Sequence, residues 1–205
     1  MKKTILVLLI FLVNVSFSQR RYVPGYLYTA NNDSISGKIK DKLFFSSPGK
    51  KIKFITADGT KKKYKAKNLY GYTLLGLMKY LSIPASTFGG SLRFMQVIED
   101  GDLILLSYTR TTSTGGSYVG SSYGGTGGGV YRGGGTTTTT RYYIMKKGNK
   151  DKTGRIPFIG FKNFMLSYVN DDAEMKKLVE EKSLTFMDTQ LIVKKYNDNK
   201  RKNKG

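Results

Sequence analysis

Two Asp-Gly pairs, each between strand-like segments, constrain the fold of this chain more than any other feature, and the segments around the first pair alternate apolar and polar residues. Asp58-Gly59 and Asp100-Gly101 supply the positive φ angles that a tight hairpin turn needs, and alternation suits a strand with one buried face. The turn-forming cluster Asn31-Asn32-Asp33-Ser34 lies between two further strand-like segments. The sequence therefore predicts three antiparallel hairpins: 25–29 with 35–42, 51–56 with 61–67, and 94–98 with 103–108.

The pattern changes after Pro157, where apolar residues recur every three or four positions. Phe161, Phe164, Met165 and Tyr168 would share one face of a short helix. Asp171 with Glu174, and Thr185 with Asp188, resemble capping boxes that open two more helices. Segment 69–83 is apolar and fits either a strand or a short helix. Strands first and helices last predict an α+β fold, an antiparallel sheet rolled into a sandwich or open barrel and followed by C-terminal helices.

Residues 111–140 differ in composition from the rest of the chain. They include 11 Gly, 9 Thr and 4 Ser, too few apolar side chains to offset the entropy of ordering. We expect a disordered insert at 111–140 between strand 103–108 and another strand at 142–146. The expected layout is one domain over 19–196, with a basic flexible tail at 197–205.

The first 18 residues resemble a secretory signal peptide. Lys2 and Lys3 precede the apolar run 4–13, and Ser16 and Ser18 are small residues before a cleavage point at Gln19. The run is shorter than the ~20 residues of a membrane-spanning helix. We therefore expect an exported protein of the periplasm or cell surface of a Gram-negative bacterium, without a transmembrane helix after cleavage but able to contact a membrane peripherally.

The absence of His and Cys excludes most catalytic and metal sites that a sequence can reveal. Zinc fingers, haem with a His or Cys ligand, Cys nucleophiles and the Ser-His-Asp triad all need these residues. Ser47-x-x-Lys50 with Lys152-Thr153-Gly154 resembles penicillin-interacting serine enzymes, but Pro48 and Gly49 disfavour the helix on which that chemistry depends. We expect no catalytic residue, no metal and no cofactor.

The lysines form the most informative pattern, since 35 Lys and Arg face 14 Asp and Glu and the formal charge is +21. They alternate with Ile39, Leu43, Ile52, Phe54, Tyr64 and Ala66 and so belong to one face of their strands. This face is either an ordinary solvated surface or a basic surface for an anionic glycolipid, a polymer or an acidic protein. Nucleic acid is not expected, because Phe54 and Tyr64 lie on the opposite face. The candidate basic surface consists of Lys38, Lys40, Lys42, Lys51, Lys53, Lys61, Lys63, Lys65 and Lys67.

Asp33-Ser34-Ile35 resembles the acceptor for general O-glycosylation of exported proteins in the Bacteroidota, which makes Ser34 a candidate site. Three groups of residues resemble an uncharacterised exported family of that phylum: Ser18-Gln19, then Gly25-Tyr26 followed by Asp33-Ser34-Ile35-Ser36-Gly37-Lys38-Ile39, and Ile192-Val193-x-x-Tyr196-Asn197. The resemblance implies an envelope protein without an assigned activity.

Together these features predict a non-enzymatic envelope protein that binds another envelope component through its sheet face or its helices. The first alternative is a charge-driven binder of an anionic glycolipid or polymer. The second is a hydrolase that works without His or Cys, and it would need a deep pocket with two carboxylates about 5–10 Å apart.

Overall fold

The computed structural model of the chain describes residues 22–31, 33–40, 49–75, 78–84, 90–119, 130–181 and 184–204. The predicted signal peptide, Lys42, Leu43 and Ser47 lie outside the described residues. The strands are β1 (Tyr22–Thr29), β2 (Ser34–Lys40), β3 (Lys51–Thr56), β4 (Lys61–Lys65), β5 (Leu69–Leu74), β6 (Met78–Pro84), β7 (Leu92–Glu99), β8 (Leu103–Thr114), β9 (Ser117–Val119), β10 (Val130–Arg132), β11 (Gly135–Lys146) and β12 (Gly154–Arg155). The helices are α2 (Phe161–Val169), α3 (Ala173–Glu181) and α4 (Thr189–Lys202), with short 3-10 turns η1 (Ala66–Asn68), η2 (Lys150–Lys152) and η3 (Phe186–Asp188).

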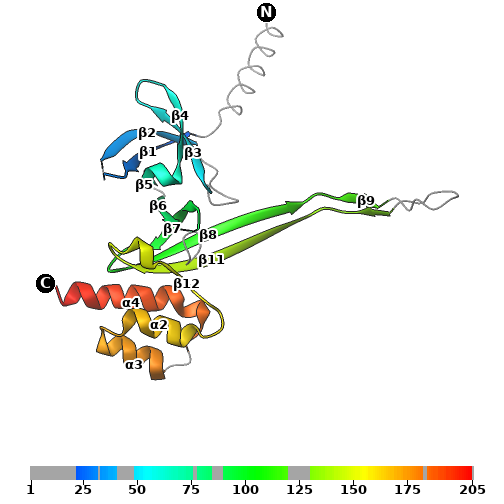
Figure 1. Cartoon of the computed structure of the whole chain (residues 1–205). Helices are drawn as coiled ribbons and strands as arrows, with labels where there is room; N and C mark the ends of the chain where they lie inside the picture. The colour runs from blue at the N-terminus through cyan, green and yellow to red at the C-terminus, as the bar shows by residue number, and fades with distance from the viewer. Residues whose placement is uncertain are drawn as a thin grey trace, which may run out of the picture.

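The α+β fold with an antiparallel sheet and C-terminal helices is confirmed. In the described part of the chain, ten strands form one sheet in the order β12-β11-β8-β7-β6-β5-β1-β2-β3-β4, and β9 pairs with β10 beyond it. The sheet is open, with β12 and β4 at its edges. Figure 1 shows the three helices packed together beneath the β8–β11 end of the sheet. All three predicted hairpins are present, and segment 69–83 contains two strands.

The middle of the sheet is buried on both faces. Adjacent strand residues point to opposite faces, and Tyr80 and Phe94 belong to one apolar cluster while their neighbours Leu81 and Met95 belong to another. Every side chain from Leu103 to Tyr108 in β8 is buried. Burial on both faces explains why this strand reads LILLSY rather than as an alternating pattern.

Two contacts join segments that are not neighbours in the strand order. Near β3, the backbone N–H of Phe94 donates to the Gly49 carbonyl at 3.0 Å, so the chain just before β3 bridges to β7. Lys150 Nζ donates to the Tyr70 carbonyl at 3.1 Å and lies 3.2 Å from the centre of the Tyr70 ring. This contact holds η2 against β5.

The helices pack on the sheet through their apolar sides and one buried amide. Met165, Val179, Ile192 and other buried side chains of α2, α3 and α4 form a core with Leu103, Leu105 and Ile144. The side chain of Asn197 accepts from the Leu103 N–H at 2.8 Å and donates to the Leu103 carbonyl at 2.9 Å. A side chain at position 101 would collide with Asn197, which explains the glycine there.

The predicted flexible tail at 197–205 is helical for most of its length. Helix α4 continues to Lys202, and Asn197 is buried. The Tyr196 hydroxyl donates to both carboxylate oxygens of Asp171, at 2.9 and 3.0 Å. Burial raises the pKa of Asp171, but hydrogen bonds from Tyr196 and Lys200 outweigh it, so the pKa lies below its ordinary value. Lys200 and Lys202, which suggest a solvated tail when only the sequence is considered, therefore belong to helix α4, which Tyr196 anchors to Asp171.

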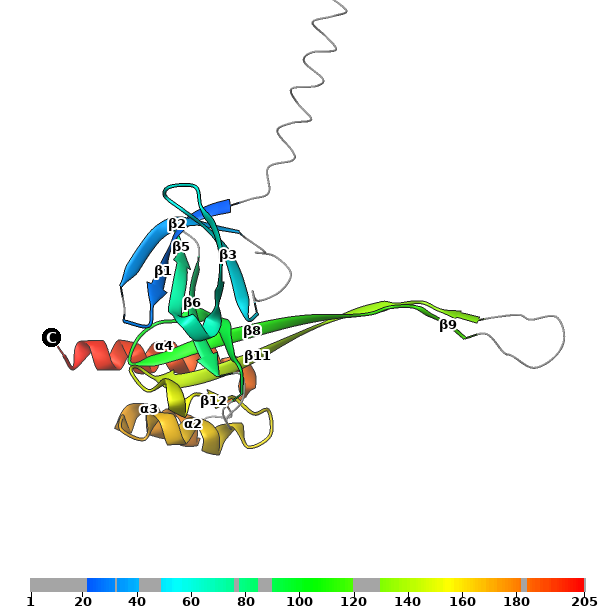
Figure 2. The same ribbon diagram turned by 45° about the horizontal axis from the view of Figure 1, so that its top comes forward.

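The expected disordered insert at 111–140 has paired strands at both of its ends. Residues Thr109–Thr114 of β8 pair with Gly135–Thr140 of β11, and this pair, which we call the arm, projects from the body of the protein (Figure 2). Thr109 and Thr140 join hydroxyls at 2.9 Å, as do Thr111 and Thr138 at 3.2 Å. Composition predicted disorder because this segment has few apolar side chains. Threonine, however, is common in strands even where it is exposed, and the pairing of β8 with β11 begins in the buried body and continues into the arm. Residues 120–129 lie outside the described residues.

The helix caps match the sequence in one case and differ in the other. Thr185 and Asp188 form the predicted capping box, which opens η3 directly before α4. At α3 the cap is Asp172, whose side chain accepts from the Met175 N–H at 3.0 Å, rather than Asp171. Asp171 is already engaged by Tyr196.

We predict that Asn197→Ala lowers the free energy of unfolding by about 2–4 kcal/mol, because it leaves the buried N–H and carbonyl of Leu103 without partners. Denaturant unfolding followed by circular dichroism measures the change. Asn199→Ala is the matched control on the same helix, since Asn199 bonds only to side chains near the surface. Its expected cost is below about 1 kcal/mol. Equal losses in the two variants would contradict the assigned role of Asn197.

The partly buried amine of Lys150 predicts a pH dependence of stability. Burial lowers its pKa to about 8 from 10.5. The unfolded chain therefore binds the proton more tightly, and the contribution of Lys150 to stability is present above pH 10.5 and lost as the pH falls through 8. The stability of the natural chain relative to Lys150→Met should rise between pH 8 and 10.5, measured by denaturant unfolding. A relative stability that stays constant from pH 8 to 10.5 would contradict the prediction.

Candidate anion-binding site

A pocket forms where strands β7 and β8 separate. The two strands pair at Gln96 with Ser107, but further along β7 the backbone of Phe94 bonds to Gly49 instead. Strand β8 continues with β11 alone and becomes the arm. The separation leaves a hollow at the base of the arm, on the sheet face opposite the helices.

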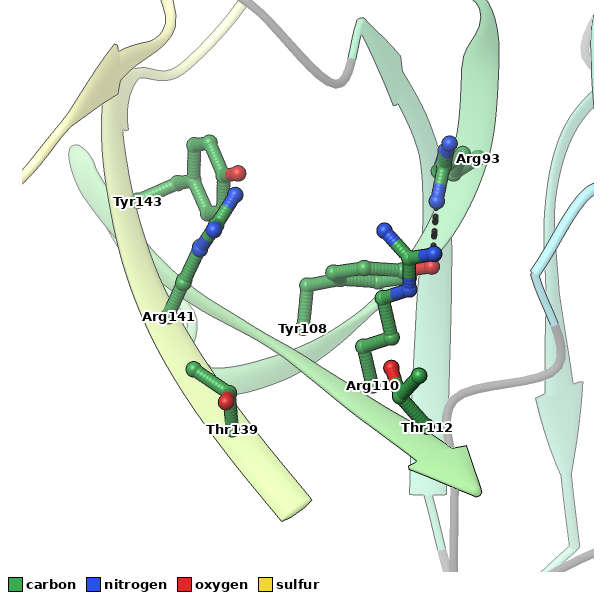
Figure 3. A pocket seen from close by; sticks show the side chains of 7 residues that line it. All are labelled: Arg93, Tyr108, Arg110, Thr112, Thr139, Arg141 and Tyr143. Atoms are coloured by element: carbon green, nitrogen blue, oxygen red, sulfur yellow. Dashed lines mark hydrogen bonds between the residues drawn. The ribbon is translucent and has the colours of Figure 1, made fainter. Parts of the chain in front are cut away.

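The pocket has a volume of about 220 Å³ and is lined by arginine, tyrosine and threonine. Figure 3 shows side chains from β7, β8 and β11 projecting into the same space. Because alternate residues of a strand share a face, the register of β8 with β11 aligns Tyr108 with Arg141 and Arg110 with Thr139. The lining residues are Arg93, Tyr108, Arg110, Thr112, Thr139, Arg141 and Tyr143.

Arg93 spans the gap between the separated strands. Its Nη1 donates to the Tyr108 hydroxyl at 2.6 Å, and its guanidinium carbon lies 5.3 Å from the centre of the Tyr108 ring. Its Nε is buried and has no hydrogen-bond partner in the structure. Tyr108 and Tyr143 are buried, whereas Arg110 and Arg141 are exposed. The pocket thus has a fixed aromatic floor, one positioned guanidinium with an unused donor, and two more guanidiniums at its mouth.

The charge of the pocket is positive and uncompensated. Within the described ranges, Arg93, Arg110 and Arg141 form no ion pair, and the carboxylates that do form ion pairs lie in the β7–β8 turn or in segment 171–198. Arginine presents a planar fork of N–H donors that matches carboxylate, phosphate and sulfate groups. The arrangement can therefore bind one anionic group against a partly desolvated surface.

The structure brings most of the candidate lysines together on the outer face of β2, β3 and β4. Lys51 lies directly opposite Lys65, and Lys53 opposite Lys63. Like charges in directly opposed positions destabilise a sheet. The opposite face is buried at Ile39, Ile52, Phe54 and Ala66, and Tyr64 is half-buried. We call the exposed lysines on the outer face of these strands the lysine face: Lys38, Lys51, Lys53, Lys61, Lys63 and Lys65.

The remaining candidates fall near this surface or outside the described residues. Lys67 is exposed in η1, Lys40 is half-buried with an interaction of its own, and Lys42 is among the residues without a description. Ser34 is exposed at the first position of β2, which leaves its hydroxyl accessible. Its O-glycosylation stays a prediction.

The carboxylate clusters have structural partners. Asp100 pairs with Lys79 at 2.6 Å, Asp102 with Lys204 at 2.8 Å, and Glu99 accepts from Gln190 at 2.8 Å. Asp171 and Asp172 anchor α4 and cap α3. Within the described ranges, no group of three or more acidic residues is arranged to hold a metal ion. Glu99 and Asp102 join α4 to the β7–β8 turn, Asp171 joins the helical layer to Lys146 of β11, and Asp100 pairs within the sheet.

A larger hollow of about 410 Å³ lies between η2 and α2, and two of its hydroxyl groups donate to backbone carbonyls of η2. Thr153 donates to the Lys150 carbonyl at 2.6 Å, and the Tyr168 hydroxyl donates to the Lys152 carbonyl at 3.2 Å. Burial raises the pKa of Tyr168, which keeps it protonated. The Thr153 hydroxyl of the Lys-Thr-Gly motif is therefore used in a hydrogen bond that stabilises the η2 turn, rather than in a reactive position.

The arginine pocket is the site that sequence reasoning missed. Arg93, Arg110 and Arg141 are single residues far apart in the chain, and Arg110 and Arg141 flank the insert that composition assigns to disorder. The one signal that could have revealed them is the common alternation of Tyr108 with Arg110 and of Arg141 with Tyr143 on two strands expected to be neighbours.

Comparison of the chain with models of protein families, with curated proteins and with solved structures finds no match.

Proposed function

We propose that the protein is an exported, non-enzymatic binding module of a Gram-negative cell envelope, and that it holds an anionic group of another envelope component in the arginine pocket. The predicted signal peptide and the resemblance to exported Bacteroidota proteins support the location. The observation that carries the binding role is the cluster of three arginines without a paired carboxylate, around two buried tyrosines.

The size of the pocket limits what it can enclose. Sites that enclose a drug-sized molecule usually measure about 300–1,000 Å³, and this pocket measures about 220 Å³. It therefore suits one charged group of a larger molecule, a carboxylate, phosphate or sulfate, while the rest of that molecule stays outside. A polymer or a glycolipid with regularly spaced acidic groups fits this description.

Binding would use donors that are already in place. Arg93 is held by Tyr108, so little side-chain freedom is lost when its guanidinium binds an oxygen. Thr112 and Thr139 add hydroxyl donors at the wall. Charge-assisted hydrogen bonds of this kind are stronger than neutral ones, and partial burial strengthens them further.

The lysine face favours a second candidate, a purely charge-driven binder of an anionic polymer. Two directly opposed lysine pairs weaken the isolated sheet, and a bound polyanion would relieve that repulsion. In the first proposal the same lysines attract the ligand at long range and so raise the association rate.

We further propose that part of the sheet rolls into an open barrel, with the lysine face outside. The Gly49–Phe94 bridge connects the two ends of this part, which consists of β3, β2, β1, β5, β6 and β7.

Removing equal charge from the two surfaces separates the candidates. We predict that Arg93→Gln/Arg110→Gln/Arg141→Gln lowers the affinity for a fluorescent dextran sulfate oligosaccharide at least about tenfold, because charge-assisted hydrogen bonds are lost along with charge. Lys51→Gln/Lys53→Gln/Lys63→Gln should lower it only about twofold to threefold, by weakened long-range attraction. Fluorescence anisotropy at physiological salt measures both.

Circular dichroism and thermal melting check that the two triple variants remain folded. Equal losses of affinity, or a larger loss in the lysine variant, would refute the arginine pocket as the binding site and favour the charge-driven candidate. In that case the affinity of the natural chain should fall steeply and continuously with added salt.

A further inference from the structure

Four large apolar side chains are exposed together at one end of the helical layer. Phe158 and Ile159, in the loop before α2, are 80% and 90% exposed, and Met187 in η3 is 85% exposed. Leu191 is 49% exposed and lies one helical turn beyond Met187. We call Phe158, Ile159, Met187 and Leu191 the apolar tip.

The fold holds the two parts of the tip side by side. The rings of Phe158 and Phe186 are 6.2 Å apart, and Phe186 also contacts Phe161 and Tyr142. Gly160 follows Ile159 with a φ of 76°, a conformation that glycine adopts readily, and α2 begins directly after it. The capping box of Thr185 and Asp188 fixes the turn that carries Met187. The exposure of these side chains is therefore imposed by well-packed neighbours.

The form and the charge of the tip indicate a lipid surface. Phe158, Ile159 and Met187 project from two turns, as do side chains that enter the interfacial region of a bilayer. Exposed cations accompany them: Arg155 and Lys162 flank the loop in the chain, and Lys194 and Lys195 follow Leu191 by three and four residues on α4. This pattern of projecting apolar groups beside lysine and arginine complements an anionic membrane, in a chain whose formal charge is +21.

We propose that the apolar tip inserts into the interface of a bilayer that contains anionic lipid, and so holds the protein on a membrane surface. The inference is independent of the arginine pocket. That pocket lies on the sheet face opposite the helices, so a protein bound through its tip would keep the pocket accessible to a ligand. Among the described residues, no helix is long and apolar enough to span a membrane.

The absence of tryptophan from the chain allows a direct test, because a single introduced indole reports on its own surroundings. Phe158→Trp labels the tip, and Tyr26→Trp labels an exposed position of β1, at the other end of the protein (Figure 1). Each variant of the full chain is mixed with vesicles of phosphatidylglycerol and phosphatidylcholine, or of phosphatidylcholine alone. We expect the emission of the Phe158→Trp variant to shift to the blue by about 10 nm or more on anionic vesicles and to be quenched by brominated lipid, as for an indole that enters the interface. The Tyr26→Trp variant should show neither change.

Two further variants identify the cause of the signal. Ile159→Ser/Met187→Ser in the Phe158→Trp background should abolish the shift, whereas Arg93→Gln/Arg110→Gln/Arg141→Gln in that background should preserve it. The proposal is overturned if the emission of the Phe158→Trp variant does not shift on either vesicle, or if that of the Tyr26→Trp variant shifts equally. It is also overturned if the tip label shifts only when envelope proteins are added, because the tip would then be a protein interface.

Discussion

The double burial of strand β8 is the constraint on which the rest of this structure depends. From Leu103 to Tyr108 its side chains alternate between the helix core and the cluster on the opposite face. Asn197 fixes the first residue of the strand to α4, and β11 pairs along its whole length. The same strand then leaves β7 and continues into solvent as the arm, so one element connects the cores, the helices and the arm.

The candidate site is a consequence of that departure. Two strands that separate leave a gap, and a gap lined by arginine cannot close by apolar packing, because burying unpaired cations costs free energy. Arg93 spans it by bonding to Tyr108, yet one donor stays unused. Asp171 and Asp102, which form ion pairs with Lys146 and Lys204, are engaged between the helical layer and the sheet rather than at the pocket. Because the three arginines have no paired carboxylate, an anionic ligand would stabilise the pocket by supplying the negative charge.

Local signals in the sequence predicted the hairpins and several helices, because Asp58-Gly59 and the Thr185 capping box act within a few residues. What depended on distant contacts could not be predicted in this way. Asn197 looks like the start of a polar tail until its bond to Leu103, 94 residues away, is known. The arginine pocket depends on strand register across the insert at 111–140, whose composition concealed that its ends are paired. The lysine face was visible because its residues are close in sequence.

The most direct test of the account is to locate a bound anion by crystallography. Crystals of the protein soaked in selenate, a tetrahedral oxyanion whose selenium scatters anomalously, would reveal each anion site without a prior choice of residue. The account predicts that the strongest anomalous peak lies in the pocket, about 4 Å from the guanidinium carbons of Arg93, Arg110 and Arg141. Peaks on the lysine face with none in the pocket would contradict it.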